Sequence, residues 1–412
     1  MTRLPAFLLC TSIAVGAGCS KTEKPVFNGA GFTADPAPPG PLNGLFLTTD
    51  NGSDQVSAVD PLTRQVKWNI PVGFIPVELE GPHHMTADPG GQFAYLNLSE
   101  AVIGSGSGPH GSHGTGTIPG FVLKLSTKDA SLAAFVPVDP NPGDLTITPD
   151  GKTIYVTHYD LVKLGKGVQA GDLRQGDSNL VVINPQSMSV TRRVPLCPAA
   201  HGTRLSPDAK TLYATCLTDE MVVVDLATFT VTRKLLPGIT TESPSCTRCP
   251  YALSVAPDAT VWVSSLGPGG GTTGGGRVDV YDPAANAFDA ARSVPNLCGR
   301  ALFAAFHQKS ASPTDYLAYV PEQGGSCGDS VQIYQSAGPG QPSASAGQVA
   351  LARDACFNAH ILMLSPDGKT GYLVCEGDHV NPGTFAFLDL QNNSVISSAP
   401  LGVFPDGMAF IP

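Results

Sequence analysis

The feature that most constrains the fold of this chain is an internal repeat. The stretch from Cys197 to Cys216 recurs from Cys356 to Cys375, an offset of 159 positions, with both cysteines, an Ala-His pair, a Ser-Pro-Asp turn and a lysine in the same places. A fixed internal period is typical of repeat architectures, in which similar supersecondary units stack against one another. The chain is therefore expected to contain several units, two of which carry a histidine and a cysteine pair at equivalent positions.

A shorter turn motif extends the repeat to the rest of the chain. Segments with a Pro-Asp or Asp-Pro core also occur at residues 87–91, 148–152, 256–258 and 404–407. Proline presets one backbone angle, aspartate bonds to its own turn and glycine tolerates positive φ, so each segment predicts a tight turn. The flanking runs, such as 152–157 and 221–225, are short and apolar or alternating. They predict β-strands, and no sustained helical period is found after the N-terminal region.

Four-stranded units account for almost the whole chain. Six are expected, at residues 83–139, 142–197, 200–238, 250–296, 299–351 and 356–402. Residues 404–411 provide a lone inner strand, and residues 43–73 provide three further strands that complete a seventh unit. Joining the two ends closes a ring and removes exposed sheet edges. The sequence therefore predicts an all-β fold, a seven-bladed β-propeller of four-stranded antiparallel blades over residues 43–412.

One of the predicted strands carries a family resemblance. Lys152-Thr-Ile-Tyr-Val-Thr157, after Thr148-Pro-Asp-Gly151, resembles the repeat of the YVTN seven-bladed β-propeller family. The likeness spans about 370 residues and implies the same fold. Similar propellers include surface-layer and lipoprotein modules, sugar lactonases, and redox domains of nitrite, nitrous-oxide and amine-oxidising enzymes. The resemblance therefore implies a fold without choosing a function.

Composition and charge narrow the possible partners. The chain has 46 Gly and 37 Pro among 412 residues, which suits turn-dense β-structure in a single domain. Its formal net charge is −10, and no basic cluster is present that would neutralise phosphates. A nucleic-acid partner is therefore not expected.

The N-terminus has the features of an export signal. Arg3 precedes an apolar run at residues 4–15, and small residues lead to Cys19. Residues 1–18 resemble a bacterial lipoprotein signal, which implies that Cys19 is lipidated and that the chain's partner there is the membrane. The alternative is an ordinary signal peptide that is cut near Gly18 and leaves Cys19 unmodified. By the same resemblance, Ser20 favours an outer-membrane lipoprotein, on the periplasmic or the cell-surface side, and residues 19–42 form a Pro/Gly-rich tether.

The cysteines predict disulfides. Eight remain after Cys10 and Cys19, an even number in an exported chain. The repeat register pairs Cys197 with Cys216, Cys356 with Cys375, and Cys298 with Cys327, which leaves Cys246 with Cys249. The last pair is a Cys-x-x-Cys next to an arginine, which also suits thiol redox exchange, although no strand-to-helix setting accompanies it.

The candidate binding residues fall on one rim of the predicted ring. Long insertions at residues 101–119, 158–178, 266–276 and 376–383 share that rim, and loops on a rigid scaffold commonly carry binding residues. The candidate ligand-binding residues are His83, His84, His158, His201, His360, His379, Glu376 and Asp378.

Three of these histidines recur in the repeat register. His83, His201 and His360 each lie six residues before the proline of a turn, at the mouth of the central channel. Neutral imidazoles gathered there suit copper, zinc or haem iron. Alternatively, each histidine hydrogen-bonds loop carbonyls, since the three belong to well-separated units. His110 and His113 lie on one insertion and suggest adventitious metal binding.

Three functions follow from this pattern. The first is an exported, lipid-anchored module that binds a protein or small molecule through its loop-rich rim. The second is a metal- or haem-associated redox module that works with an electron-transfer partner. The third is a lactonase-like hydrolase, for which Glu242, Glu376 and Asp378 are the available acids, although no recurrent acidic pair occurs. No Cys-x-x-Cys-His motif for covalent haem is present.

We expect a free-thiol count near zero in the unreduced, denatured, processed chain, because the eight cysteines that remain after Cys10 and Cys19 are expected to pair and a lipidated Cys19 has no free thiol. A thiol-reactive reagent measures this count. Disulfide-exchange activity that disappears in a Cys246→Ser/Cys249→Ser variant would contradict a purely structural role for that pair.

Overall fold

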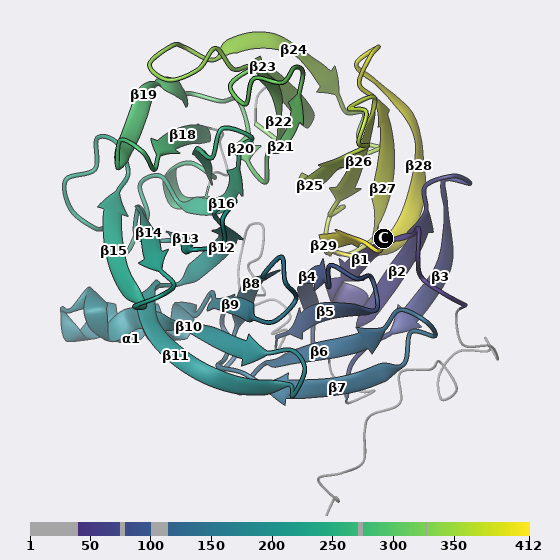
Figure 1. Cartoon of the computed structure of the whole chain (residues 1–412), viewed down its shortest axis with the longest axis horizontal. Coiled ribbons are helices and arrows are strands. Elements are labelled where there is room, and N and C mark those ends of the chain that lie inside the picture. The colour runs from purple at the N-terminus through teal and green to yellow at the C-terminus, as the bar shows by residue number, and fades with distance from the viewer. Residues whose placement is uncertain (1–39, 75–78, 100–113, 271–274, 326–327) are drawn as a thin grey trace, which may run out of the picture.

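The computed structural model describes residues 40–74, 79–99, 114–270, 275–325 and 328–412. Seven sheets surround a central axis as the blades of a ring (Figure 1). Six sheets have four strands, and the seventh has five because its inner edge is divided between β20 and β21. The predicted seven-bladed, antiparallel propeller is therefore confirmed.

The blades are numbered from the one that joins both chain ends, and each is given from its inner to its outer strand. Blade one is β29 (Pro405–Phe410), β1 (Phe46–Asp50), β2 (Gln55–Asp60) and β3 (Gln65–Pro71). Blade two is β4 (Pro82–Ala87), β5 (Phe93–Leu98), β6 (Phe121–Ser126) and β7 (Leu132–Pro137). Blade three is β8 (Pro142–Ile147), β9 (Ile154–His158), β10 (Asp177–Asn184) and β11 (Ser189–Pro198). Blade four is β12 (Ala200–Leu205), β13 (Thr211–Cys216), β14 (Glu220–Asp225) and β15 (Thr230–Leu235).

The remaining blades follow the same order. Blade five is β16 (Pro250–Val255), β17 (Val261–Ser265), β18 (Arg277–Asp282) and β19 (Ala287–Val294). Blade six is β20 (Arg300–Ala301) with β21 (Ala305–Gln308), β22 (Tyr316–Gln323), β23 (Ser330–Gln335) and β24 (Ala344–Ala350). Blade seven is β25 (Ala359–Leu364), β26 (Thr370–Cys375), β27 (Pro382–Asp389) and β28 (Ser394–Val403). Short 3₁₀ helices are η1 (Asn51–Ser53), η2 (Leu173–Gly176) and η3 (Pro268–Gly270).

The ring closes as the sequence predicts. The C-terminal strand β29 pairs antiparallel with β1, so that Phe46 lies opposite Phe410 and Thr48 opposite Met408. Phe46 also packs on blade seven, with its ring centroid 4.4 Å from that of Tyr372. Strands from the two ends of the chain thus complete blade one, and Phe46 packs it against blade seven.

One predicted turn is a strand instead. The sequence predicts a Pro-Asp-Gly turn at residues 404–407, whereas Pro405, Asp406 and Gly407 are the first three residues of β29. A proline is tolerated at the first position of a strand, where its missing N–H leaves no ladder bond unmade. Asp406 therefore occupies the position that His83 occupies on β4. Genuine turns are found at the other blades, as the bond from the Gly151 N–H to the Thr148 carbonyl shows.

A short helix was not expected from the sequence. The insertion after β9 forms α1 (Leu161–Ala170), whose first turn is capped by the Asp160 side chain and whose end carries Gly171 at a φ of 66°. Two internal glycines, Gly165 and Gly167, hide its helical period. No helix among the described residues is long and apolar enough to cross a membrane.

Three predicted disulfides are confirmed. Cys197 bonds Cys216, and Cys356 bonds Cys375, each across 19 positions of sequence. Cys197 belongs to β11, so its bond joins the outer strand of blade three to blade four. The third bond, Cys246–Cys249, lies in the loop that leads into β16. Cys298 is also disulfide-bonded, and Cys327, its predicted partner, lies outside the described residues.

The inner strands approach each other closely at glycines. A Cβ placed on Gly407 would lie 2.9 Å from the His84 Cα, and one on Gly202 would lie 2.9 Å from the Tyr251 carbonyl oxygen. Real Cβ atoms do not approach backbone this closely. These glycines therefore allow the strands of neighbouring blades to converge at the axis.

We expect Gly407→Ala to destabilise the protein by about 1–3 kcal/mol, because the added methyl group separates β29 from β4 at the closure of the ring. Gly165→Ala in α1 is the matched control, since a Cβ there meets nothing within 4 Å. Urea unfolding of both variants measures the difference. Equal stability of Gly407→Ala and the unchanged protein would contradict the role of this contact.

Candidate functional site

The second residue of most inner strands lies at the centre of the ring. These positions hold Asp406, His83, Gly143, His201, Tyr251 and His360 on β29, β4, β8, β12, β16 and β25. Because the strands converge on one axis, residues from well-separated parts of the sequence meet there. The separation of their blades around the ring does not keep His83 and His201 apart, since their ring centroids lie 5.3 Å from each other.

Three histidines form a buried cluster at this centre. His84 lies 4.4 Å from His83 and 5.3 Å from His201, measured between ring centroids. One nitrogen of each ring lies within 4.8 Å of the others. All three residues are at most 2% exposed. The cluster is therefore a compact, nitrogen-rich site that is shielded from bulk water.

A bulge brings two adjacent residues to the same site. Neighbouring side chains on a regular strand point to opposite faces, which would separate His83 from His84. The register between β4 and β5 shifts between Pro82 and Met85, and such a bulge redirects side chains. Both rings consequently turn towards the axis.

Backbone carbonyls orient two of the imidazoles. Nδ1 of His83 lies 2.7 Å from the Gly143 carbonyl oxygen, and Nδ1 of His201 lies 3.1 Å from the Tyr251 carbonyl oxygen. A carbonyl only accepts, so each Nδ1 carries the proton and each Nε2 keeps its lone pair. Both carbonyls are themselves fixed, by Asn97 Nδ2 at 3.0 Å and Thr215 Oγ1 at 2.8 Å. This is how metal-binding imidazoles are commonly oriented.

Carboxyl groups border the cluster. Asp406 Oδ2 lies 3.5 Å from His83 Nε2, and Asp144 Oδ1 lies 3.9 Å from His84 Nδ1. Complete burial raises the pKa of Asp406 well above its usual range, although Thr49 donates a hydrogen bond to it at 3.0 Å. A nearby cation would favour the charged form of Asp406 at the edge of the cluster.

His360 contacts Glu376 and is not part of the compact histidine cluster, although the repeat groups it with His83 and His201. Its ring centroid is 5.8 Å from that of His84, and its Nδ1 is 2.7 Å from Glu376 Oε1. The other oxygen of Glu376 lies 2.7 Å from Nε2 of His379, whose ring stacks on Phe404. His84 rather than His360 is therefore the third member of the compact cluster with His83 and His201.

The other predicted rim residues lie apart from the cluster. Burial lowers the pKa of His158 to about 4, and its Nδ1 bonds the Asn179 carbonyl at 2.9 Å within blade three. Asp378 is exposed and accepts bonds from the N–H groups of Val380 and Asn381, which hold its pKa at about 2. His110 and His113 lie outside the described residues.

Two tyrosines complete the centre and were not predicted from the sequence. Tyr251 stacks on His201 with centroids 3.6 Å apart, and Tyr159 meets the same ring edge-on at 5.4 Å. Burial raises the pKa of Tyr251 well above its usual range. Tyr251 lies six residues before Pro257, the same spacing that identified the histidines, so the repeat register contained a signal for it.

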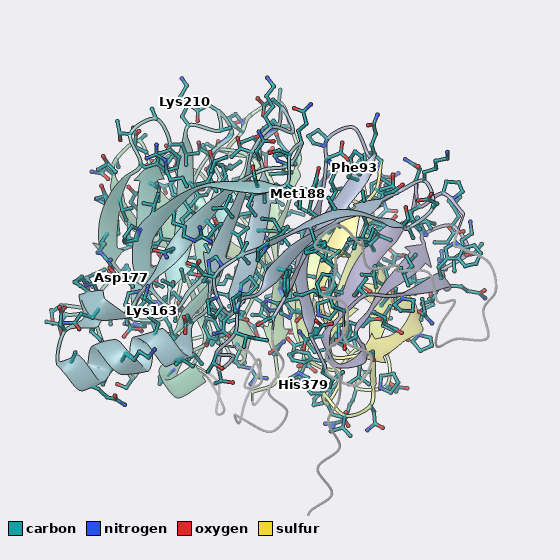
Figure 2. The ribbon with its side chains drawn as sticks, turned by 90° about the horizontal axis from the view of Figure 1, so that it is seen from below. Phe93, Lys163, Asp177, Met188, Lys210 and His379 are labelled. Atoms are coloured by element: carbon teal, nitrogen blue, oxygen red, sulfur yellow. A yellow bond between two sulfur atoms is a disulfide. The ribbon has the colours of Figure 1, made fainter. Side chains whose placement is uncertain are left out.

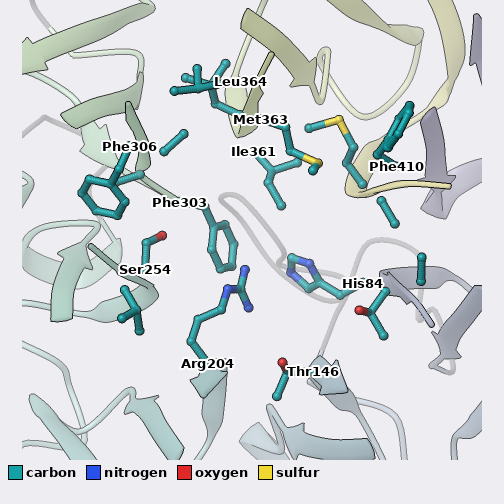
Figure 3. A pocket seen from close by; sticks show the side chains of 18 of the residues that line it. His84, Thr146, Arg204, Ser254, Phe303, Phe306, Ile361, Met363, Leu364 and Phe410 are labelled. Carbon is teal, nitrogen blue, oxygen red and sulfur yellow. The ribbon is translucent and has the colours of Figure 1, made fainter. Parts of the chain in front are cut away.

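The two sides of the cluster differ. Lys163, Asp177 and His379 mark the insertion face, which is opposite the face of Lys210 and the turns (Figure 2). Towards the insertion face, apolar side chains from the ends of the second strands pack beside Tyr251, among them Leu217 and Leu266. Towards the turn face lies a cavity of about 780 Å³, lined near the cluster by His84, Arg204 and Phe303 (Figure 3). We call this cavity the chamber.

Comparison with known proteins supports the fold alone. No family model and no curated protein sequence matches the chain. Solved structures that resemble it include Kuenenia stuttgartiensis hydrazine synthase, with a TM-score of 0.56 at 15% identity over 82% of this chain and 92% of that one. Dihydro-heme d1 dehydrogenase NirN in complex with DHE gives 0.54 at 13% identity over 93% and 78%. A putative 6-phosphogluconolactonase from Bacteroides uniformis gives 0.58 at 12% identity over 88% and 98%.

We expect protonation of His158 to lower the free energy of unfolding at acid pH. Its folded-state pKa of about 4 lies below the unfolded value of 6.5, so its contribution is present above pH 6.5 and is lost as the pH falls towards 4. The pKa difference corresponds to at most about 3 kcal/mol. Between pH 7.5 and pH 4.5, the free energy of unfolding should decrease less in His158→Gln than in the unchanged protein. Equal losses in both proteins would show that His158 does not titrate in this way.

Proposed function

We propose that the protein holds one copper or zinc ion at the centre of its ring, bound by His83, His84 and His201. The observation that carries the proposal is the approach of one nitrogen from each ring to within 4.8 Å of the others in a buried site. Imidazole nitrogen suits both ions. A copper ion there would make the protein a redox module that works with an electron-transfer partner.

The three side chains fit a bare ion. Nitrogens that lie 2.0–2.1 Å from a tetrahedral ion are about 3.3 Å apart, so separations of up to 4.8 Å would have to shorten by up to about 1.5 Å on binding. The carbonyl bonds at Nδ1 of His83 and His201 already select the Nε2 lone pairs. Haem fits this cluster less well, because a flat macrocycle needs an open face beside its axial imidazole and these rings pack edge to face against one another.

The rim is a second candidate binding surface. Val168 on α1 is 45% exposed and Val380 in the 376–383 insertion is 79% exposed, and both lie on the insertion face. Exposed apolar side chains on loops suit a protein partner. A lactonase-like hydrolase is the third candidate, supported by the structural likeness to a putative 6-phosphogluconolactonase. Turnover of lactone substrates would favour that function over the other two.

The proposal also includes export and a lipid anchor. It is supported by the signal-like residues 1–18, by Cys19, and by disulfides that suit an oxidising compartment. The acceptor of any electron would then be a partner outside the cytoplasm, at the outer membrane. Globomycin treatment of the producing cells tests the anchor, because it blocks processing at a lipidated cysteine.

We expect one equivalent of copper or zinc to remain bound after loading and dialysis of protein purified without a His tag. All variants are made in a His110→Ala/His113→Ala protein, so that adventitious metal binding by these two histidines is removed. Adding His83→Ala/His84→Ala/His201→Ala should abolish retention, whereas adding His307→Ala as a matched control should not. Elemental analysis measures the content, and equal retention in the triple variant would reject the site.

Loss of folding would imitate loss of the metal site. His84→Gln is therefore measured alone, with its melting temperature, and should weaken binding at least tenfold while the fold persists. Nitrogen hyperfine structure in the Cu²⁺ spectrum should report three imidazoles in the unchanged protein. A spectrum of an exposed aquo-like ion would contradict the proposal.

A further inference from the structure

We propose that the chamber binds a largely apolar organic molecule that carries one carboxylate or comparable oxyanion, and that this ligand enters from the turn face. This site is distinct from the proposed metal site and does not require the ion. The two share His84 alone, which lies at the inner end of the chamber.

The size and position of the chamber suit a small molecule. Its volume of about 780 Å³ falls within the 300–1,000 Å³ that is usual for ligand pockets. Its outer residues include Gln308 and Pro366, which are exposed at the turn face. Tyr251 and Leu266 are buried in the apolar layer at the opposite end. Within the described residues, the route into the chamber therefore leads from the turn face.

Arg204 supplies the recognition of an oxyanion. Its Nη1 donates to Asp144 Oδ2 at 2.5 Å and to the Thr203 carbonyl at 2.6 Å, which fixes the direction of the side chain. No hydrogen bond between described residues engages Nε or Nη2. The Arg204 side chain is 28% exposed, and its guanidinium extends into the chamber between Phe303 and His84 (Figure 3). A planar guanidinium with a free edge matches a carboxylate or sulfonate.

Phe303 lines the chamber as a fixed, almost fully buried ring. It lies 4.9 Å beneath the Arg204 guanidinium and stacks on His360 at an interplanar angle of 12°. These contacts on both sides hold the ring in place. Met363 and Met408 also line the chamber, and their flexible thioethers adapt to ligand shape. A fixed aromatic ring and adaptable methionines favour an apolar body.

Paired fluorescent probes test both parts of the inference. The probe 8-anilinonaphthalene-1-sulfonate has the required anion and rings, and N-phenyl-1-naphthylamine has the same rings without the anion. We expect saturable binding of the sulfonate at one site per chain, with a higher affinity than that of the amine. Arg204→Met should weaken sulfonate binding at least tenfold and leave amine binding within twofold.

Arg192 offers a matched control. It is an exposed arginine that lies over the Phe229 ring at 4.5 Å, a geometry similar to that of Arg204 over Phe303. Arg192→Met should bind both probes as the unchanged protein does. Equal sulfonate affinity in Arg204→Met and the unchanged protein would overturn the proposal, since the probe would then occupy another apolar surface such as that of Phe74 and Phe121.

A second variant separates ligand binding from folding and from the metal. Thr146 faces the middle of the chamber, so Thr146→Trp should fill it and abolish binding of both probes while the melting temperature and retained metal are unchanged (Figure 3). Binding of both probes by a folded Thr146→Trp variant would also overturn the proposal. The same titrations on chelator-treated protein should give the same affinities, so a failure of the metal proposal leaves this result interpretable.

Discussion

The convergence of seven inner strands on one axis is the constraint on which the rest of this structure depends. It requires that β29 complete blade one, because an open ring would leave the edge of β1 unpaired. It also requires a close approach of neighbouring backbones, which the glycines at positions 202 and 407 permit. The same approach places polar side chains from different blades in one small, buried volume.

Burial makes the chemistry of that volume unusual. Imidazole is the side chain best suited to such a place, since its neutral form can donate through one nitrogen and keep a lone pair on the other. The carbonyls of Gly143 and Tyr251 take the Nδ1 protons of His83 and His201 and thereby leave Nε2 to the site. Desolvation raises the pKa values of Asp406 and Tyr251, so the centre favours their neutral forms.

The ring has two unequal faces. Two of the predicted insertions, which contain α1 and the 376–383 loop, lie on one face, where the sequence predicts binding residues. Residues of these insertions reach the central histidines, because Tyr159 meets the His201 ring edge-on and Glu376 lies against His360. The chamber approaches the histidines from the other face, between short and regular turns. The centre of this propeller is therefore approached by insertion residues from one face and by the chamber from the other.

The repeat register determined much of the architecture by itself. Turn chemistry and strand alternation are local, so they predicted the blade count, the closure of the ring and three cysteine pairs that the structure confirms. The same spacing placed His83 and His201 at the channel. Only the tertiary structure decided that His84 joins them through a bulge, that Glu376 holds His360, and that Pro405 begins a strand. These outcomes depend on backbone register and on contacts between blades distant in sequence, which no local pattern encodes.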